Sequence, residues 1–290
     1  MLPFALLLLL SGISSAESLE WTRAHEHFLR TNYHESLAQL IPMPARTPGQ
    51  APGYNAAELQ LIGQDYFMLG EYKKATDFLE QAVAHNPGSA ETVLWLGRAY
   101  GRRAETSGPF TAPGYASKAR QMLERAVTLD PTNREAVGDL FDYYLDAPSF
   151  LGGGQNKAEA LAARVAVTDP AEGHYYQAQL AEHRKEFDTA EQHLRKALEL
   201  APRQAGRFVD LAKLLAMRGR TRESDALFAE AEQIAPDNPK LLFEHAETYI
   251  KEGRNLDEAR RLLRRYLQAH LTPNDPPKSD AETLLRKIGP

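Results

Sequence analysis

The sequence predicts an all-α fold, a solenoid of helical hairpins packed side by side, and three observations lead to it. Residues 56–89 contain two amphipathic helical patterns, with Gly70 between them and Pro87 at the end. Glycine favours the left-handed backbone at a helix end, and proline cannot continue a helix because it lacks an N–H group. Similar hairpins recur along the chain, and the apolar face of each is too wide to bury alone. Stacked hairpins bury these faces against their neighbours.

The first sixteen residues, MLPFALLLLLSGISSA, are predicted to be a secretory signal peptide. An apolar core at 4–10 is followed by the small residues Ser14, Ser15 and Ala16, which suit a cut after Ala16. The apolar run is too short to span a bilayer as a helix. A signal peptide ordinarily begins with positively charged residues, but the leading segment here contains no Lys or Arg. The alternative is therefore that the segment is not cleaved and is retained as an anchor. We expect the mature chain in the periplasm or outside the cell.

Residues 17–55 are predicted to form an N-terminal helical pair followed by a linker. Helical patterns at 19–31 and 34–40 carry a common apolar stripe, so the pair is interpreted as a degenerate repeat. Residues 42–55 are rich in Pro and Gly, which is typical of a linker or a long loop.

The regular part of the solenoid is predicted at 56–271. After the first hairpin, further hairpins are expected at 90–133, 134–170, 171–202, 205–236 and 239–271. Two consecutive hairpins are longer than the first, one by ten residues within 101–116 and the next by five within 146–155. Both segments are expected to be enlarged turns on the same edge of the solenoid. Residues 272–290 are predicted to contain a capping helix, at 279–288, that covers the end of the stack.

Small side chains recur where paired helices must approach closely, and larger ones recur where neighbouring hairpins meet. The small residues are Gly63, Ala75, Gly97, Ala119 and Ala190, and the larger ones are Tyr66, Leu79, Tyr100 and Leu123. With the closing prolines, this spacing resembles the tetratricopeptide repeat (TPR), whose period is about 34 residues. The resemblance implies a right-handed α-solenoid of six repeats, or seven with the N-terminal pair. With the predicted signal peptide, it points to an exported bacterial member of the family.

The composition argues against several classes of function. The net charge is −5 and the pI about 6.0, so nothing favours a nucleic-acid binder. The chain has no cysteine, which excludes disulfides, thiolate catalysis and thiolate metal sites. His25 and His27 point to different faces of their predicted helix, and none of the nine histidines lies in an HExxH motif. We therefore expect no metal site, no cofactor and, beyond the first sixteen residues, no membrane span.

No enzyme motif is present: the chain lacks a GxSxG elbow, a paired-carboxylate motif and a dinucleotide fingerprint, so an enzyme is not expected. The glycine run at 152–154 precedes a predicted helix, where backbone N–H groups are able to bind an anion. A Walker A loop is excluded because no GK[ST] follows. A flexible enlarged turn is the first interpretation, and an anion site stays open. The basic stretch at 254–265 is interpreted as a solvated helix face, with a membrane or nucleic-acid patch as the alternative.

In the family that this chain resembles, the first helices of the repeats line a concave groove that receives a peptide or a partner's helix. The groove positions fall on Gln60, Gln64, Phe67, Leu94, Arg98, Arg102, Asp142, Tyr175 and Gln179, and in later repeats on Val209, Lys213, Phe243 and Glu247. Arg98 and Arg102 share a helix face and are candidates for gripping a carboxylate. Pairing with acids of the next helix, such as Asp142, is the alternative. Family co-chaperones that clamp a C-terminal carboxylate have Lys and Asn where Gln60 and Gln64 stand, so that clamp is not expected.

The two enlarged turns are the second candidate surface. They carry the aromatic residues Phe110, Tyr115 and Phe150, followed by Leu151. If both turns leave the same edge of the solenoid, these side chains form one apolar surface beside the groove. The alternative is that they fold back and cover the helices beneath.

The leading functional hypothesis is a non-catalytic scaffold or adaptor of the bacterial periplasm or cell envelope that binds a protein or peptide partner. The alternative is a regulatory or positioning subunit of an envelope enzyme or secretion complex. An enzyme in its own right is the least favoured hypothesis, since no convergent polar constellation is visible. The identity of the partner and the oligomeric state are left open.

Overall fold

The protein is seen in a computed structural model that describes residues 19–41 and 53–289, and every regular element in these ranges is helical. The hairpins are α1 (Leu19–Leu29) with α2 (Tyr33–Leu40), α3 (Ala56–Met68) with α4 (Tyr72–His85), α5 (Ala90–Thr106) with α6 (Ala112–Leu129), α7 (Arg134–Asp146) with α8 (Gln155–Thr168), α9 (Pro170–His183) with α10 (Phe187–Leu200), α11 (Ala205–Met217) with α12 (Thr221–Ile234), and α13 (Pro239–Glu252) with α14 (Leu256–Gln268). A last helix, α15 (Lys278–Ile288), packs on α13 and α14.

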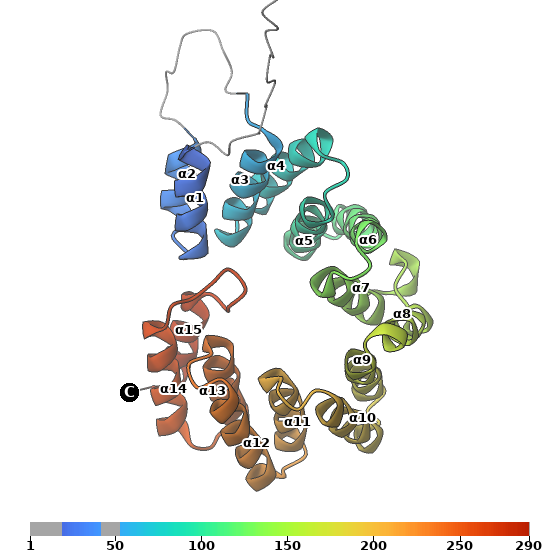
Figure 1. Ribbon diagram of the computed structural model, residues 1–290, viewed down its shortest axis with the longest axis vertical. Coiled ribbons are helices and arrows are strands. Elements are labelled where there is room, and N and C mark those ends of the chain that lie inside the picture. Colours follow the sequence, from blue (N-terminus) through green and yellow to red (C-terminus); the bar gives the residue numbers. More distant parts are fainter. Residues whose placement is uncertain (1–18, 42–52, 290) are drawn as a thin grey trace, which may run out of the picture.

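The predicted fold class is confirmed: the described chain is an all-α solenoid of hairpins. Its N-terminal pair, α1 and α2, is a further hairpin, and it packs on α3. The hairpins follow an arc that nearly closes into a ring, so that α1 and α2 lie close to the segment before α15 (Figure 1). The predicted signal peptide and most of the predicted linker lie outside the described residues. Within the described ranges no helix is long and apolar enough to cross a bilayer.

Side-chain caps fix where several first helices begin. Asn55 accepts a hydrogen bond from the Glu58 N–H, and the Glu58 carboxylate accepts one from the Asn55 N–H, each 3.0 Å long. This reciprocal capping box satisfies N–H groups that have no partner inside the helix. Ser89, Asn133, Asp169 and Asn238 cap α5, α7, α9 and α13 by accepting from a backbone N–H three residues on. Each cap therefore sets the start of a helix that faces the inside of the arc.

A left-handed residue ends the first helix in five of the hairpins. Thr31, Gly70, Lys185, Gly219 and Gly253 have φ angles between +60° and +76°. The prediction that Gly70 supplies such a backbone is confirmed. Lys185 holds the position that glycine fills in three other hairpins, and for an L-residue this conformation costs about 1–2 kcal/mol.

Replacing Lys185 by glycine is expected to raise the free energy of unfolding by about 0.5–1 kcal/mol, because glycine adopts the left-handed backbone without the penalty. Glycine also increases the conformational entropy of the unfolded chain, and this offsets part of the stabilisation. Urea unfolding followed by far-UV circular dichroism measures the change. Lys185→Ala is the control, since alanine removes the same charge and keeps the penalty. Equal stability of the two variants would mean that the left-handed backbone is not the cause.

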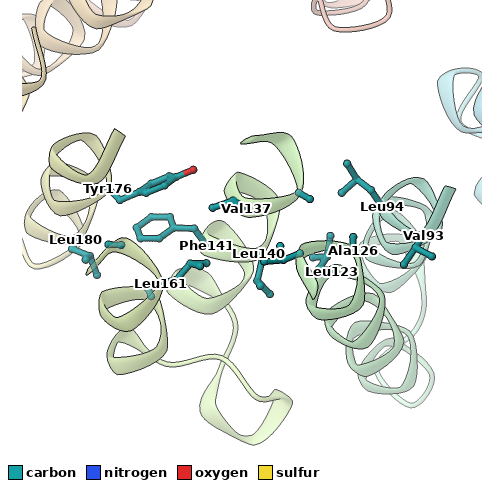
Figure 2. Close-up of a cluster of buried hydrophobic side chains, with 14 residues drawn as sticks. Val93, Leu94, Leu123, Ala126, Val137, Leu140, Phe141, Leu161, Tyr176 and Leu180 are labelled. Atoms are coloured by element: carbon teal, nitrogen blue, oxygen red, sulfur yellow. The ribbon is translucent and has the colours of Figure 1, made fainter. Parts of the chain in front are cut away.

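The hydrophobic core runs along the arc between successive hairpins. In its central part, side chains from α5 to α9 point toward one another, as Figure 2 shows. The fully buried Phe141 of α7 stacks on Tyr176 of α9 at 4.4 Å between ring centres. The small positions work as predicted: a Cβ on Gly63 would lie 2.5 Å from Leu79 Cγ, and one on Gly97 would lie 3.1 Å from Leu123 Cδ2. Glycine at both positions lets the paired helices approach this closely without displacing the leucines.

The prediction of an enlarged turn at 101–116 is wrong. The extra residues lengthen both helices, to 17 residues in α5 and 18 in α6, and only 107–111 connect them. Tyr115 explains the extension, because its ring stacks on Tyr100 at 6.3 Å and lies 4.0 Å from the Arg103 guanidinium. The two added helical turns are thereby packed against each other.

The glycine run at 152–154 lies in a compact turn that contains a short 3₁₀ helix, η1 (Ser149–Leu151). The N–H groups of Gly152, Gly153 and Gly154 donate to the carbonyls of Ser149, Pro148 and Tyr144. A Cβ on Gly153 would lie 1.9 Å from the Ala147 carbonyl oxygen, which requires glycine there. Because all three N–H groups are already bonded, the turn does not form the anion site that the sequence left open.

Candidate binding groove on the concave face

The odd-numbered helices from α3 to α13 face the inside of the arc (Figure 1), as the family resemblance implies for first helices. Two cavities lie along the N-terminal half of this inner face. The first, of about 1180 Å³, lies between α1, α3, α5 and residues 272–274, and the second, of about 860 Å³, between α3, α5, α7 and residues 273–280. Both are lined by Trp95, Pro273 and Asn274, so we treat them as one N-terminal groove.

The predicted amides Gln60 and Gln64 lie on α3 in the first cavity. Gln60 accepts a hydrogen bond from the Thr92 hydroxyl of the next hairpin. Gln64 is only 5% exposed, yet its amide makes no hydrogen bond with any described residue. Phe67, one turn further along α3, packs edge-on against Trp95 at 5.4 Å and lines the second cavity. The structure thus brings three predicted positions together in one groove.

Leu94 lines the first cavity but offers little exposed surface there. It is 1% exposed and belongs to the core of Figure 2, where it packs with the next hairpin. Its position on α5 is one at which the inner face meets the core, so the side chain supports the wall of the groove.

The joint carboxylate grip by Arg98 and Arg102 is not formed. The Arg98 guanidinium pairs with Asp139 at 2.5 Å and Glu135 at 3.0 Å, both on α7. Arg102 pairs with Glu105 of its own helix and donates to the Tyr72 hydroxyl at 3.3 Å. The alternative, pairing with acids of the next helix, holds for Arg98, although the acids are Asp139 and Glu135.

Asp142 itself has no cationic partner among the described residues. It lies on α7 one turn before Asp146, which also lacks such a partner, and both line the second cavity. Although its side chain is exposed, the surrounding walls reduce its hydration, and Asp139 and Asp146 add negative charge. Together these effects raise the pKa of Asp142 to about 6.

Replacing Asp142 by asparagine is expected to raise the free energy of unfolding at pH 7.5 by about 1 kcal/mol. This is less than the pKa shift alone implies, because solvent screens the charge of an exposed side chain. The carboxyl group binds its proton more tightly in the folded chain, so stability is lost as the pH rises from about 4 to about 6, and the gain should shrink as the pH falls toward 4. Urea unfolding at several pH values measures it. Asp237→Asn is the control, since Asp237 is 97% exposed and lies 3.9 Å from Arg265. A gain that is independent of pH would contradict this explanation.

A third cavity, of about 600 Å³, lies between α9, α11 and α13 and contains Tyr175 and Gln179. Gln179 donates to the Tyr175 hydroxyl at 2.6 Å, while its own buried carbonyl oxygen has no partner. The Arg207 guanidinium lies 4.6 Å from the Tyr175 ring centre. Burial raises the pKa of Glu182, and burial also raises the pKa of Asp210 to about 7, against the opposing charge of Arg207.

The sequence missed Asp210 and Glu244, which line the inner face between α9 and α13. On α11 the predicted Val209 and Lys213 line the same cavity as Asp210, although Val209 is almost fully buried. On α13 the predicted Phe243 is buried in the core, and the transferred positions are one residue out of register. The apolar Phe243 followed by the acid Glu244 is the signal that would have corrected this register.

The four side chains of the predicted apolar surface divide between the two interpretations. Phe110 and Phe150 are 98% and 81% exposed. Tyr115 instead packs against α5, and its hydroxyl accepts from Arg103. Leu151 is half-buried, and its carbonyl accepts from the Tyr143 hydroxyl at 2.9 Å. Two of the four therefore cover the helices beneath, and the two phenylalanines remain available.

A metal centre has no support in the described residues, since no three His, Asp or Glu side chains there are grouped to hold an ion. The arrangement of the inner face is that of a binding surface, with buried amides, aromatic rings and carboxylates along neighbouring helices.

Comparisons with known proteins agree with this architecture. The tetratricopeptide repeat profile matches residues 171–204, which form α9 and α10, and no curated protein sequence matches the chain. A tetratricopeptide repeat protein from Parabacteroides merdae is 16% identical, with a TM-score of 0.55 over 93% of this chain and 97% of that one. Human IFIT1, solved as a dimer with PPP-AAAA, is 19% identical, with a TM-score of 0.52 over 86% and 54%. A thermophilic TPR protein of Thermus thermophilus is 18% identical, with a TM-score of 0.45 over 80% and 97%.

The first two structures share the solenoid fold at a low identity that carries no functional detail. The matched repeat lies in the hairpin whose second helix keeps Ala190 at a small position. A family repeat and the fold of the whole described chain thus lead to the same conclusion. The chain contains a tetratricopeptide repeat at 171–204, and its described part folds as a solenoid of the kind built from such repeats.

Proposed function

We propose that this protein is a non-catalytic adaptor of the bacterial periplasm or cell envelope that binds a segment of a partner protein at its concave face. The observation that carries the proposal is the row of cavities on the inner helices, where the buried carbonyl oxygen of Gln179 has no partner and the Gln64 amide has none among the described residues. Unpaired buried polar groups are costly in a free protein and are satisfied when a ligand supplies donors and acceptors. The exposed Phe110 and Phe150 offer a second contact beside the groove.

The envelope location rests on the first sixteen residues and on the lack of cysteine. Expression of the full chain in a bacterial host, followed by fractionation and mass measurement, tests it. The expected product is a periplasmic chain that begins at Glu17. A full-length chain confined to the cytoplasm would remove this part of the proposal.

Site-specific photo-crosslinking tests the binding surface. A benzophenone amino acid is placed at Arg102 or Asp142 on the inner face, or at Phe110 or Phe150, and the matched control is Val167, which is 83% exposed on α8. The same crosslinked partner is expected from the two inner positions and none from Val167. Crosslinks at the two phenylalanines would extend the surface to the turns. Equal crosslinking from Val167, or none from the inner positions, would reject the concave face as the site.

A further inference from the structure

The second cavity of the N-terminal groove is strongly acidic. Its lining contains six carboxylates against the two guanidinium groups of Arg98 and Arg102, an excess of four negative charges. The carboxylates belong to Glu105, Asp139, Asp142, Asp146, Asp275 and Asp280. The whole chain has a net charge of only −5, so an excess of four is large for one cavity. A cleft lined by one sign of charge focuses its field on ligands of the opposite sign.

The cations present in this cavity are already used. Arg98 is held by Asp139 and Glu135, and Arg102 by Glu105. Asp142 and Asp146 remain, one helical turn apart on α7, with no cation within reach among the described residues. Like charges at this spacing repel each other, so the wall formed by α7 is stabilised by any cation that binds between them.

An independent observation comes from the adjoining first cavity. Gln64 is only 5% exposed and lines that cavity, yet its amide has no hydrogen-bond partner among the described residues. A primary amide offers two donors and an acceptor, the set that pairs with the main chain of an extended peptide. Trp95 lines both cavities where they join, and the Arg98 guanidinium lies 5.1 Å from its ring centre.

We infer that the N-terminal groove binds an extended, basic segment of a partner protein, with the main chain at Gln64 and a Lys or Arg side chain at Asp142 and Asp146. The inference rests on the proposed function, since it names the chemistry of the partner at the same concave face. It excludes an anionic occupant, because a nucleic acid or a C-terminal carboxylate would meet four uncompensated negative charges.

Peptide titration tests this chemistry. The probes are a fluorescein-labelled peptide of alternating Arg and Ala and its counterpart with Glu in place of Arg, measured by fluorescence anisotropy with residues 17–290. The Arg peptide is expected to bind and the Glu peptide is not. Both tryptophans of the chain, Trp21 and Trp95, line the first cavity, so unlabelled Arg peptide should also change the intrinsic fluorescence.

Substitutions locate the site. The double variant Asp142→Asn, Asp146→Asn is expected to weaken binding of the Arg peptide by about tenfold or more, since two close charge contacts are lost. The control Glu199→Gln, Asp237→Asn removes the same charge outside the groove and should change the affinity by less than about twofold. Gln64→Leu, which keeps every charge, should weaken binding while leaving its salt dependence unchanged.

Three results would overturn the inference. The first is binding of the Glu peptide as tightly as the Arg peptide. The second is an equal effect of the two double variants, which would mean diffuse attraction to the whole chain. The third is a crosslinked partner that has no basic segment, and this result would leave the proposed function standing. Conversely, a failure of all inner-face crosslinks would reject the proposed function even if the peptide titrations succeed.

Discussion

Replacing Phe141 by alanine is expected to lower the free energy of unfolding by about 3–5 kcal/mol. The ring is fully buried on α7 and stacks on Tyr176 of α9, so its removal leaves a cavity between two consecutive hairpins. In a solenoid each repeat contacts only its neighbours, so we expect α7 to α9 to open before the rest of the chain. Urea unfolding measures the total loss, and amide hydrogen exchange shows where protection is lost first.

Phe150→Ala is the matched control for this prediction. It is the same substitution only nine residues away, but its ring is 81% exposed in the turn around η1. We expect it to change the free energy of unfolding by less than about 0.5 kcal/mol. Similar losses in the two variants, or uniform loss of protection along the chain, would show that the core between hairpins does not carry the stability in this way.

Asp65 is expected to make the stability of the N-terminal hairpin dependent on pH. It lies fully buried on α3, where its carboxyl accepts a hydrogen bond of 2.7 Å from the Ser36 hydroxyl of α2. Burial raises the pKa of Asp65 to about 8, and the Ser36 hydrogen bond offsets only part of this effect. The folded chain therefore keeps a proton that the unfolded chain has already released, and stability falls as the pH rises toward 8.

The comparison with Asp65→Asn isolates this effect, because asparagine has the same shape and does not ionise. The two proteins should be similarly stable near pH 4, whereas at pH 8.5 the variant should be more stable by about 2–4 kcal/mol. Urea unfolding across this range measures the difference, with Trp21 of α1 as a local fluorescent reporter. Asp77→Asn, at an exposed ion pair with Lys73, is the control and should show no such pH dependence. A constant difference between wild type and Asp65→Asn would mean that Asp65 is ionised throughout.

The fold was predictable because it depends on features that are local in sequence. Gly63 and Gly97 mark close helix contacts, and Gly70 marks a left-handed turn, each by residue type and spacing alone. The length of α5 and α6 was not predictable in this way. Their extension depends on Tyr115 meeting Tyr100 and Arg103, a contact between side chains of two helices.

The candidate site was predictable only in part. Gln64 and Asp142 were found because the family's groove positions transfer to α3 and α7 without a shift. On α13 the transfer slipped by one residue, and a shift of that size exchanges a buried Phe243 for a groove-lining Glu244. Asp65 looks in the sequence like another solvated acid, and its burial follows only from the packing of α2 on α3.

The near closure of the arc has a consequence for communication along the chain. In an open solenoid the first and last repeats are independent, since only neighbours touch. Here residues 272–274 line the same cavity as α1 and α3, and the Asp275 carboxylate contributes to raising the pKa of Tyr33 in α2 to about 12, after burial and Asp65. The two ends of the described chain thus share one binding surface. Occupancy of that surface and the docking of α15 are therefore thermodynamically linked, and each must alter the other by the same free energy.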